Sequence, residues 1–104
     1  MDLSQYLKAL EAFKAHDPFM SAQLMEVFIT VCLNEGQSAQ ALELQLAIPK
    51  STLSRHLGHL GPRYRRGAQG LQLIRLEENP ADRRSKLVYL TDRGQALREA
   101  LIRA

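Results

Sequence analysis

Apolar residues recur at helical spacing at the start of the chain. Within residues 2–15 they form a single stripe: Leu3, Leu7, Leu10 and Phe13, with Tyr6 beside it. A repeat of three and four residues predicts an amphipathic helix over residues 2–15.

A second helix is predicted to begin at Asp17-Pro18, because a capping residue followed by proline is typical of a first helical turn. Its apolar set is broad enough for a largely buried helix: Phe19, Met20, Leu24, Val27, Phe28, Val31 and Cys32. The segment Asn34-Glu35-Gly36 is expected to end this helix, with glycine just past its last turn.

Two short helices with a sharp connection follow. Ser38 is a suitable cap for a helix that carries Leu42 and Leu46 and stops before Pro49. The next helix, residues 50–60, has an apolar stripe at Leu53, Leu57 and Leu60. Its opposite face holds small, polar and basic residues: Ser51, Arg55, Gly58 and His59, flanked by Thr52 and Ser54. This division of faces predicts a helix-turn-helix.

The pattern changes from helical to alternating after Gly61-Pro62. The segment "RYRRGAQG", up to Gly70, reads as a basic loop. A strand is predicted where leucines alternate with polar residues, at Leu71, Gln72, Leu73, Arg75 and Leu76. Residues 87–90 would pair with it, which makes "EENPADRRSK" the tip of a β-hairpin. Thr91 is expected to cap a last helix.

These elements predict a mainly α protein with a small β-hairpin, an α+β fold, in the order of four helices, two strands and a fifth helix. A helix-turn-helix followed by such a hairpin is a winged helix-turn-helix. At 104 residues the chain is expected to form one domain over residues 1–104, since this length supports a single modest core.

The net charge of +3 hides an uneven distribution. Residues 1–49 carry −4, residues 50–86 carry nine basic against three acidic residues, or +6, and residues 87–104 carry +1. Positive charge concentrated in the middle third predicts a polyanionic partner, and nucleic acid is the commonest.

Several classes of protein fit the sequence poorly. It holds no apolar run of the roughly 18 residues that a membrane helix needs, and Asp2 stands where a secretory signal is basic, so a cytoplasmic protein without membrane contact is expected. A lone cysteine, Cys32, agrees with a reducing compartment. A phosphate-binding glycine loop, a complete set of metal ligands and a motif with a nucleophile and a base are all missing, which argues against an enzyme, a metal site or a cofactor.

Two motifs carry a resemblance to a known family. "STLSR", Ser51 to Arg55, and "DRRSKLVYLTDRG", Asp82 to Gly94, resemble the MarR family of bacterial transcription regulators, and the likeness covers about residues 38–98. It implies a homodimer on palindromic double-stranded DNA, with helix 50–60 in the major groove and the wing, residues 78–86, in the minor groove. Many members release DNA when a small ligand or oxidant acts, so an effector of unknown identity is also implied.

The sequence departs from the family pattern in four places. Glu43 stands where a small residue is usual, and His56 where an apolar one is more common. The loop from 61 to 70 is longer and more basic than usual, and the last helix, 91–104, is shorter than the family's dimerisation helices.

The resemblance also implies roles for single residues. Asp82 matches the acid that orients a wing arginine, Arg84, toward the minor groove, while Arg83 between them is a candidate phosphate contact. The recognition-helix candidates are Lys50, Ser51, Thr52, Ser54, Arg55 and His59. Short hydroxyl side chains let a helix approach the bases, and an arginine can form two hydrogen bonds with guanine. Candidate phosphate contacts are Lys50, Lys86 and, in the basic loop, Arg63, Arg65 and Arg66.

Each of these assignments has a simpler alternative. The wing cations can be a solvated hairpin tip, Arg55 a surface ion pair, and "RYRR" a solubilising loop. His56 and His59 have metal-ligand spacing, but a site normally needs further ligands. Cys32 lies on an apolar face and fits a small buried residue better than a redox sensor.

The leading hypothesis is a sequence-specific DNA-binding transcription regulator that acts as a repressor. The alternative is a phage- or plasmid-type accessory protein of the same fold that binds DNA without strong sequence preference or binds a protein. The helices at 1–15 and 92–104 are candidate dimerisation elements through Leu3, Leu7, Leu10, Leu97 and Leu101, unless they close the core of the single chain.

Overall fold

The computed structural model describes residues 2–65 and 68–104 and contains nine elements in that part of the chain. They are α1 (Leu3–Lys14), α2 (Ala22–Leu33), α3 (Ala39–Leu46), α4 (Lys50–Leu60), β1 (Arg63–Arg65), β2 (Ala68–Gln69), β3 (Ile74–Glu78), β4 (Lys86–Leu90) and α5 (Asp92–Ile102). The predicted winged helix-turn-helix is confirmed, including the bounds of helix 50–60. The segment predicted as a basic loop instead contains a second short antiparallel hairpin, β1–β2.

Two of the three predicted helix caps are confirmed, since Ser38 caps α3 and Thr91 caps α5. Asp2, which was not predicted as a cap, caps α1 through a capping box with Gln5. The prediction for α2 is wrong, because Ser21 rather than Asp17 accepts the capping hydrogen bond, from the amide of Leu24. Asp17 caps a turn at Phe19 instead, and the Phe19 side chain, predicted to be buried, is 93% exposed.

The core forms around α2. Val27, Phe28 and Val31 are fully buried there, and α3, α4 and the β3–β4 hairpin pack against it. Phe13 meets Phe28 edge to face with ring centroids 6.0 Å apart, which holds the end of α1 against α2. Leu97 of α5 joins the same core at 2% exposure, so it is not available on the surface to a second chain.

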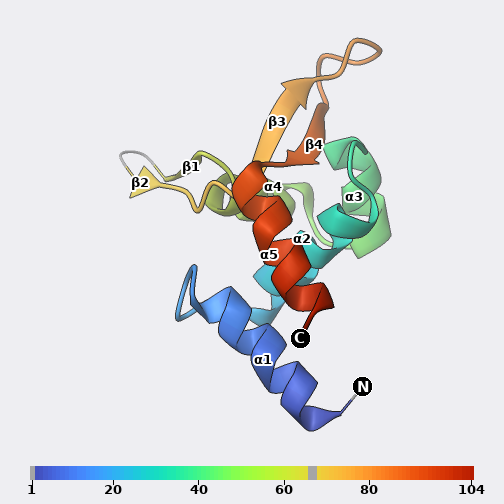
Figure 1. Cartoon of the computed structure of the whole chain (residues 1–104). Coiled ribbons are helices and arrows are strands. Elements are labelled where there is room, and N and C mark those ends of the chain that lie inside the picture. The colour runs from blue at the N-terminus through green and yellow to red at the C-terminus, as the bar shows by residue number, and fades with distance from the viewer. Residues whose placement is uncertain (1, 66–67) are drawn as a thin grey trace.

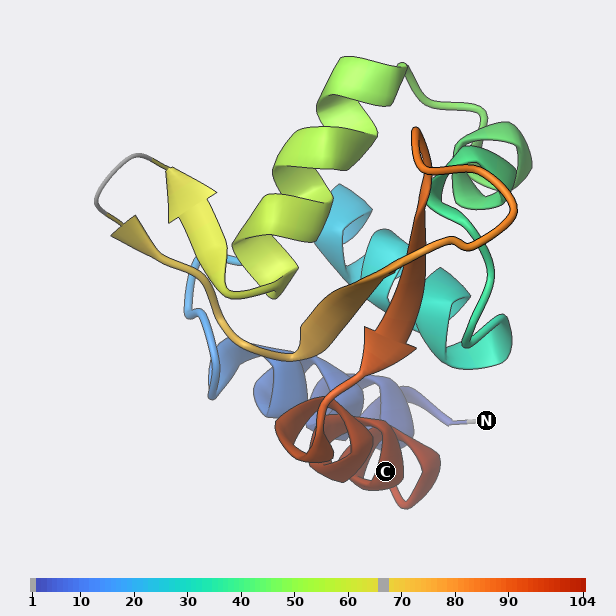
Figure 2. The same ribbon diagram turned by 90° about the horizontal axis from the view of Figure 1, so that it is seen from above.

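The hairpin β3–β4 is the wing. Its register pairs Ile74 with Leu90 at the base and Glu78 with Lys86 near the tip. The segment before α3 lies along β4, since the Gly36 amide donates to the Val88 carbonyl and the Val88 amide donates to the Gln37 carbonyl. The wing projects from one end of the molecule, and α1 lies at the other end (Figure 1). Helix α1 lies beside α5 (Figure 2).

Candidate nucleic-acid interface

Helix α4 presents the predicted division of faces. Leu53, Leu57 and Leu60 are buried at 4% exposure or less, and this stripe fixes the rotation of the helix. The Ser51, Ser54 and Arg55 side chains are exposed as a consequence, and Lys50 is exposed at the helix start. Thr52 is half-buried. The outer face of α4 therefore offers two hydroxyls and a guanidinium to solvent.

The two histidines of α4 contact the α1–α2 connection and the first turn of α2. The His59 Nε2 atom lies 3.4 Å from the Asp17 carboxylate, and the His56 Nε2 atom lies 2.8 Å from the Gln23 side-chain oxygen. Burial lowers the pKa of His56, and the charges of His59 and Arg55 lower it further. His59 thus approaches Asp17 and is less exposed than Ser51, Ser54 and Arg55.

The wing tip holds an acid and a base in one turn. The Arg84 amide and Nε both donate to Oδ1 of Asp82, at 3.0 and 3.3 Å. These bonds, the backbone one first, hold the pKa of Asp82 below its usual value. The Arg84 side chain is nevertheless 92% exposed, so its guanidinium is open to solvent although Asp82 holds it through Nε. Arg83 and Lys86 are also exposed.

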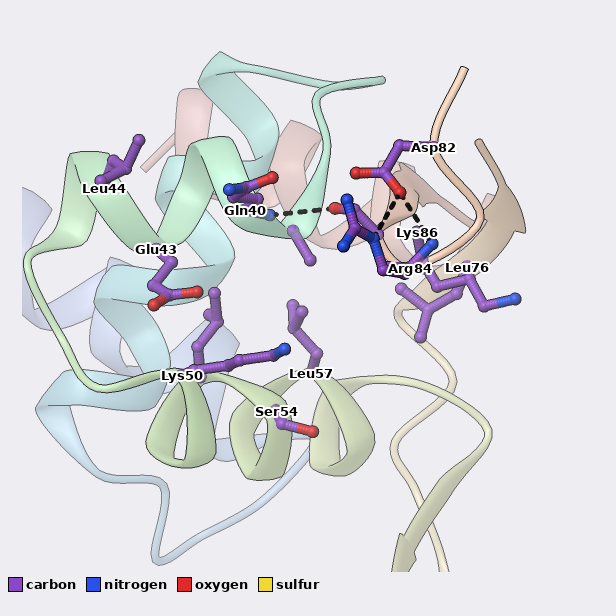
Figure 3. Close-up of a pocket in the computed structure, with 13 residues that line it drawn as sticks. Gln40, Glu43, Leu44, Lys50, Ser54, Leu57, Leu76, Asp82, Arg84 and Lys86 are labelled. Atoms are coloured by element: carbon purple, nitrogen blue, oxygen red, sulfur yellow. Dashed lines mark hydrogen bonds and ion pairs between the residues drawn. The ribbon is translucent and has the colours of Figure 1, made fainter. Parts of the chain in front are cut away.

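A cavity of about 520 Å³ lies between the wing and the helix-turn-helix. Its walls come from α3 (Gln40, Glu43, Leu44), α4 (Lys50, Ser54, Leu57) and the wing (Leu76, Asp82, Arg84, Lys86), as Figure 3 shows. The structure therefore brings the predicted recognition helix and wing to the same hollow. Lys50, Arg84 and Lys86 make it basic, although Glu43 and Asp82 also line it.

The sequence did not point to the contact between Gln40 and Ser85 in the wall of this hollow. Gln40 lies in the first turn of α3, and its backbone N–H donates to the Ser85 hydroxyl in the wall of the cavity. Ser85 was visible only as one letter within the charged tip, and burial, at 8% exposure, is what distinguishes it. Glu43, noted as unusual for its position, was not predicted to approach the wing.

Other predicted residues stand apart from the hollow or cannot be placed. The side chains of Arg63, Arg65 and Arg66 lie outside the described residues. The Arg75 guanidinium stacks on the Tyr89 ring, 4.7 Å from its centroid, and pairs with Glu77.

Burial raises the pKa of the Cys32 thiol to about 11, which keeps it neutral at pH 7. Within residues 2–65 and 68–104 no cluster of potential metal ligands is present, and no helix is long and apolar enough to cross a membrane.

The fold is similar to that of solved MarR-type structures. A mutant MarR from E. coli complexed with operator DNA superposes with a TM-score of 0.68 at 20% identity, over 96% of this chain and 64% of that one. RV1404 from Mycobacterium tuberculosis superposes with a TM-score of 0.73 at 18% identity, over 95% of this chain and 62% of that one. The PcaV transcriptional regulator from Streptomyces coelicolor, in complex with its natural ligand, superposes with a TM-score of 0.62 at 23% identity, over 79% of this chain and 52% of that one.

These superpositions show a MarR-like winged-helix fold. The present chain spans about half to two thirds of the length of these three proteins. No family model matches the sequence, and no curated protein matches it.

Proposed function

We propose that this chain is a sequence-specific, double-stranded DNA-binding transcription regulator that acts as a repressor. In this proposal α4, residues 50–60, enters the major groove and the wing, residues 78–86, reaches the adjacent minor groove. The observation that carries it is the basic hollow shared by α4 and the wing tip, with Lys50 and Ser54 on one wall and Arg84 and Lys86 on the other.

The outer face of α4 suits a major groove. Ser51 and Ser54 are short enough for the helix backbone to approach base edges, and Arg55 is long enough for a bidentate contact with guanine. Lys50 at the helix start and Lys86 on the wing are suited to the phosphates that lie between two neighbouring grooves. His59, which was also predicted as a DNA contact, lies 3.4 Å from the Asp17 carboxylate and is less exposed than these residues.

The wing suits a minor groove. A narrow minor groove has a strongly negative potential, and a thin hairpin can carry an arginine into it where a whole domain would not fit. The exposed Arg84 guanidinium, held at its base by Asp82, meets this requirement. Arg83 and the arginines of the β1–β2 segment (Arg63, Arg65 and Arg66) would add phosphate contacts.

Similar proteins of known structure support the same function. MarR from E. coli was solved with operator DNA, AbfR was solved bound to DNA, and the BpsR structure concerns regulation of DNA binding by 6-hydroxynicotinic acid. By analogy we propose a homodimer, with α1 as the contact, and release of DNA by a small ligand. Leu3, Leu7 and Leu10 on α1 are exposed and suit such a contact, whereas Leu101 packs partly against the core.

The test is selection of bound duplexes from a random pool, followed by titration of a selected duplex and a scrambled one over a salt series. The selected duplex should bind about a thousandfold more tightly, the lower range for specific regulators. Equal affinity at every salt concentration would instead support the accessory protein without sequence preference.

A further inference from the structure

One serine connects the wing to the helix-turn-helix. Ser85 follows Arg84 directly and precedes β4, and its Oγ accepts a hydrogen bond from the Gln40 amide at 3.3 Å (Figure 3). Among the residues whose burial is described, Ser85 is the one polar residue that is buried, with 8% of its surface exposed. A buried hydroxyl on a surface hairpin needs a partner, and α3 supplies it.

The Gln40 amide belongs to the first turn of α3. Amide groups at a helix start have no acceptor within the helix and need one from elsewhere. Ser38, the helix's own cap, accepts from the Ala41 amide at 3.1 Å. The Gln40 amide is instead satisfied by Ser85, 45 residues further along the chain. The wing therefore completes the capping of the first helix of the helix-turn-helix.

The hydrogen bonds of the wing tip show how much depends on this contact. Those described for residues 79–84 stay within the turn: Asp82 to Asn79, Ala81 to Asn79, and Arg84 to Asp82. Nearer the base of the wing, the backbone of residues 36–38 holds β4 at Leu87 and Val88. Among the described hydrogen bonds, Ser85 thus makes the outermost one between the wing and the body.

We propose that Ser85 is a positioning residue that sets the place of the Arg84 guanidinium relative to α4, and so the alignment of the wing with the minor groove. Arg84 is one peptide bond away, and its own turn is rigidly closed by Asp82. Anchoring Ser85 to α3 therefore fixes the separation between the wing arginine and α4, which follows α3 after a short turn. The inference rests on the proposed DNA-binding function.

A double-mutant cycle on DNA affinity tests this role. Arg84→Ala is expected to weaken binding about tenfold in the unchanged protein but only about twofold in a Ser85→Ala background, as coupled groups do. Ser38→Ala is the matched control, because it removes a hydroxyl cap from the same helix, whereas residue 38 meets Leu87 of the wing through its backbone, which the substitution keeps. In the Ser38→Ala background, Arg84→Ala should still weaken DNA binding about tenfold. Equal losses in all three backgrounds would overturn the inference.

Amide hydrogen exchange of the free protein provides a readout that does not require DNA. Ser85→Ala should speed exchange at Gln40 and at residues 82–86, whereas Ser38→Ala should speed it in α3 alone. Unchanged wing exchange in Ser85→Ala would refute the anchor even if DNA binding is intact. Failure of the unaltered protein to bind any duplex would refute the proposed function, with the exchange result still deciding whether Ser85 holds the wing.

Discussion

At the scale of single residues, Asp82 and Glu43 are two acids on one basic hollow with different surroundings. Asp82 accepts two hydrogen bonds from Arg84, whereas Glu43 is a half-buried residue of α3 on the opposite wall. From charge alone, removal of either carboxylate should strengthen the binding of a polyanion. The geometry separates them, because Asp82 also holds the arginine that approaches DNA.

We predict that Asp82→Ala weakens DNA binding, by about threefold to fivefold as expected for one exposed charge pair. Glu43→Gln should strengthen binding, because it removes a negative charge without disturbing the wing. Titration of both variants at one salt concentration checks the opposite signs. A gain of affinity in Asp82→Ala would mean that the acid only repels DNA.

Arg55 and Lys50 allow base and phosphate contacts to be separated. Arg55→Ala should cost about 1–3 kcal/mol on a selected duplex and relax the preference at one base pair. Lys50→Ala should weaken all sequences alike and reduce the salt slope by about one. Titration against a set of single-base variants distinguishes them, and an unchanged base preference in Arg55→Ala would exclude it as a base contact.

At the scale of elements, the start of α5 is pressed against the entry to β3. A Cβ atom on Gly94 would lie 1.9 Å from the Leu73 carbonyl oxygen, far inside any permitted contact. The Leu73 carbonyl also accepts from the Thr91 amide, and Thr91 caps α5. The base of the wing and the start of α5 are therefore in direct backbone contact, and position 94 has no room for a side chain.

Gly94→Ala is therefore expected to lower the free energy of unfolding by about 1–3 kcal/mol, the usual cost of overpacking. Thermal unfolding followed by circular dichroism measures it. Gln95→Ala, on the exposed face one residue later, should change stability little. A Gly94→Ala protein as stable as its parent would show that α5 can move away from the strand.

At the scale of the whole molecule, two histidines make stability depend on pH. Burial lowers the pKa of His16, helped by Arg93 of α5, and burial also lowers that of His56. A histidine with a lowered pKa binds its proton less well in the folded state than in the unfolded state. Its stabilising contribution is complete above the usual pKa of 6.5 and is lost as pH falls below that value.

The melting temperature is accordingly predicted to fall as pH drops from about 7 to 5, above the range where carboxylates titrate. A His16→Asn, His56→Gln double variant should show a flatter profile between those values. Differential scanning calorimetry across the series measures both. A parent protein with a flat profile would contradict the assignment of these two groups.

Self-association is the second property of the whole molecule. Leu7 of α1 is 57% exposed beside the exposed Leu3 and Leu10, so Leu7→Glu should leave the fold intact and abolish the proposed dimer. Lys8→Glu places the same charge on an exposed neighbouring position and is the control. Sedimentation velocity should give a monomer for the first variant and the parent's state for the second; a parent that is itself monomeric would refute the dimer.

The sequence by itself determined most of the local structure. The apolar stripe Leu53, Leu57 and Leu60 defined α4 and its rotation, and Ser38 and Thr91 marked helix starts, because periodicity and capping act over only a few residues. The start of α2 was predicted wrongly at Asp17, because Ser21, four residues later, accepts the capping hydrogen bond.

The tertiary structure alone decided which residues meet. Leu97 and Leu7 look alike as helical leucines, yet one is buried in the core and the other is exposed. The contact between Ser85 and Gln40 joins segments 45 residues apart, and the direction of His59 toward Asp17 depends on where the α1–α2 connection passes. Such pairings arise from the packing of whole elements, since no short-range pattern specifies a partner far along the chain.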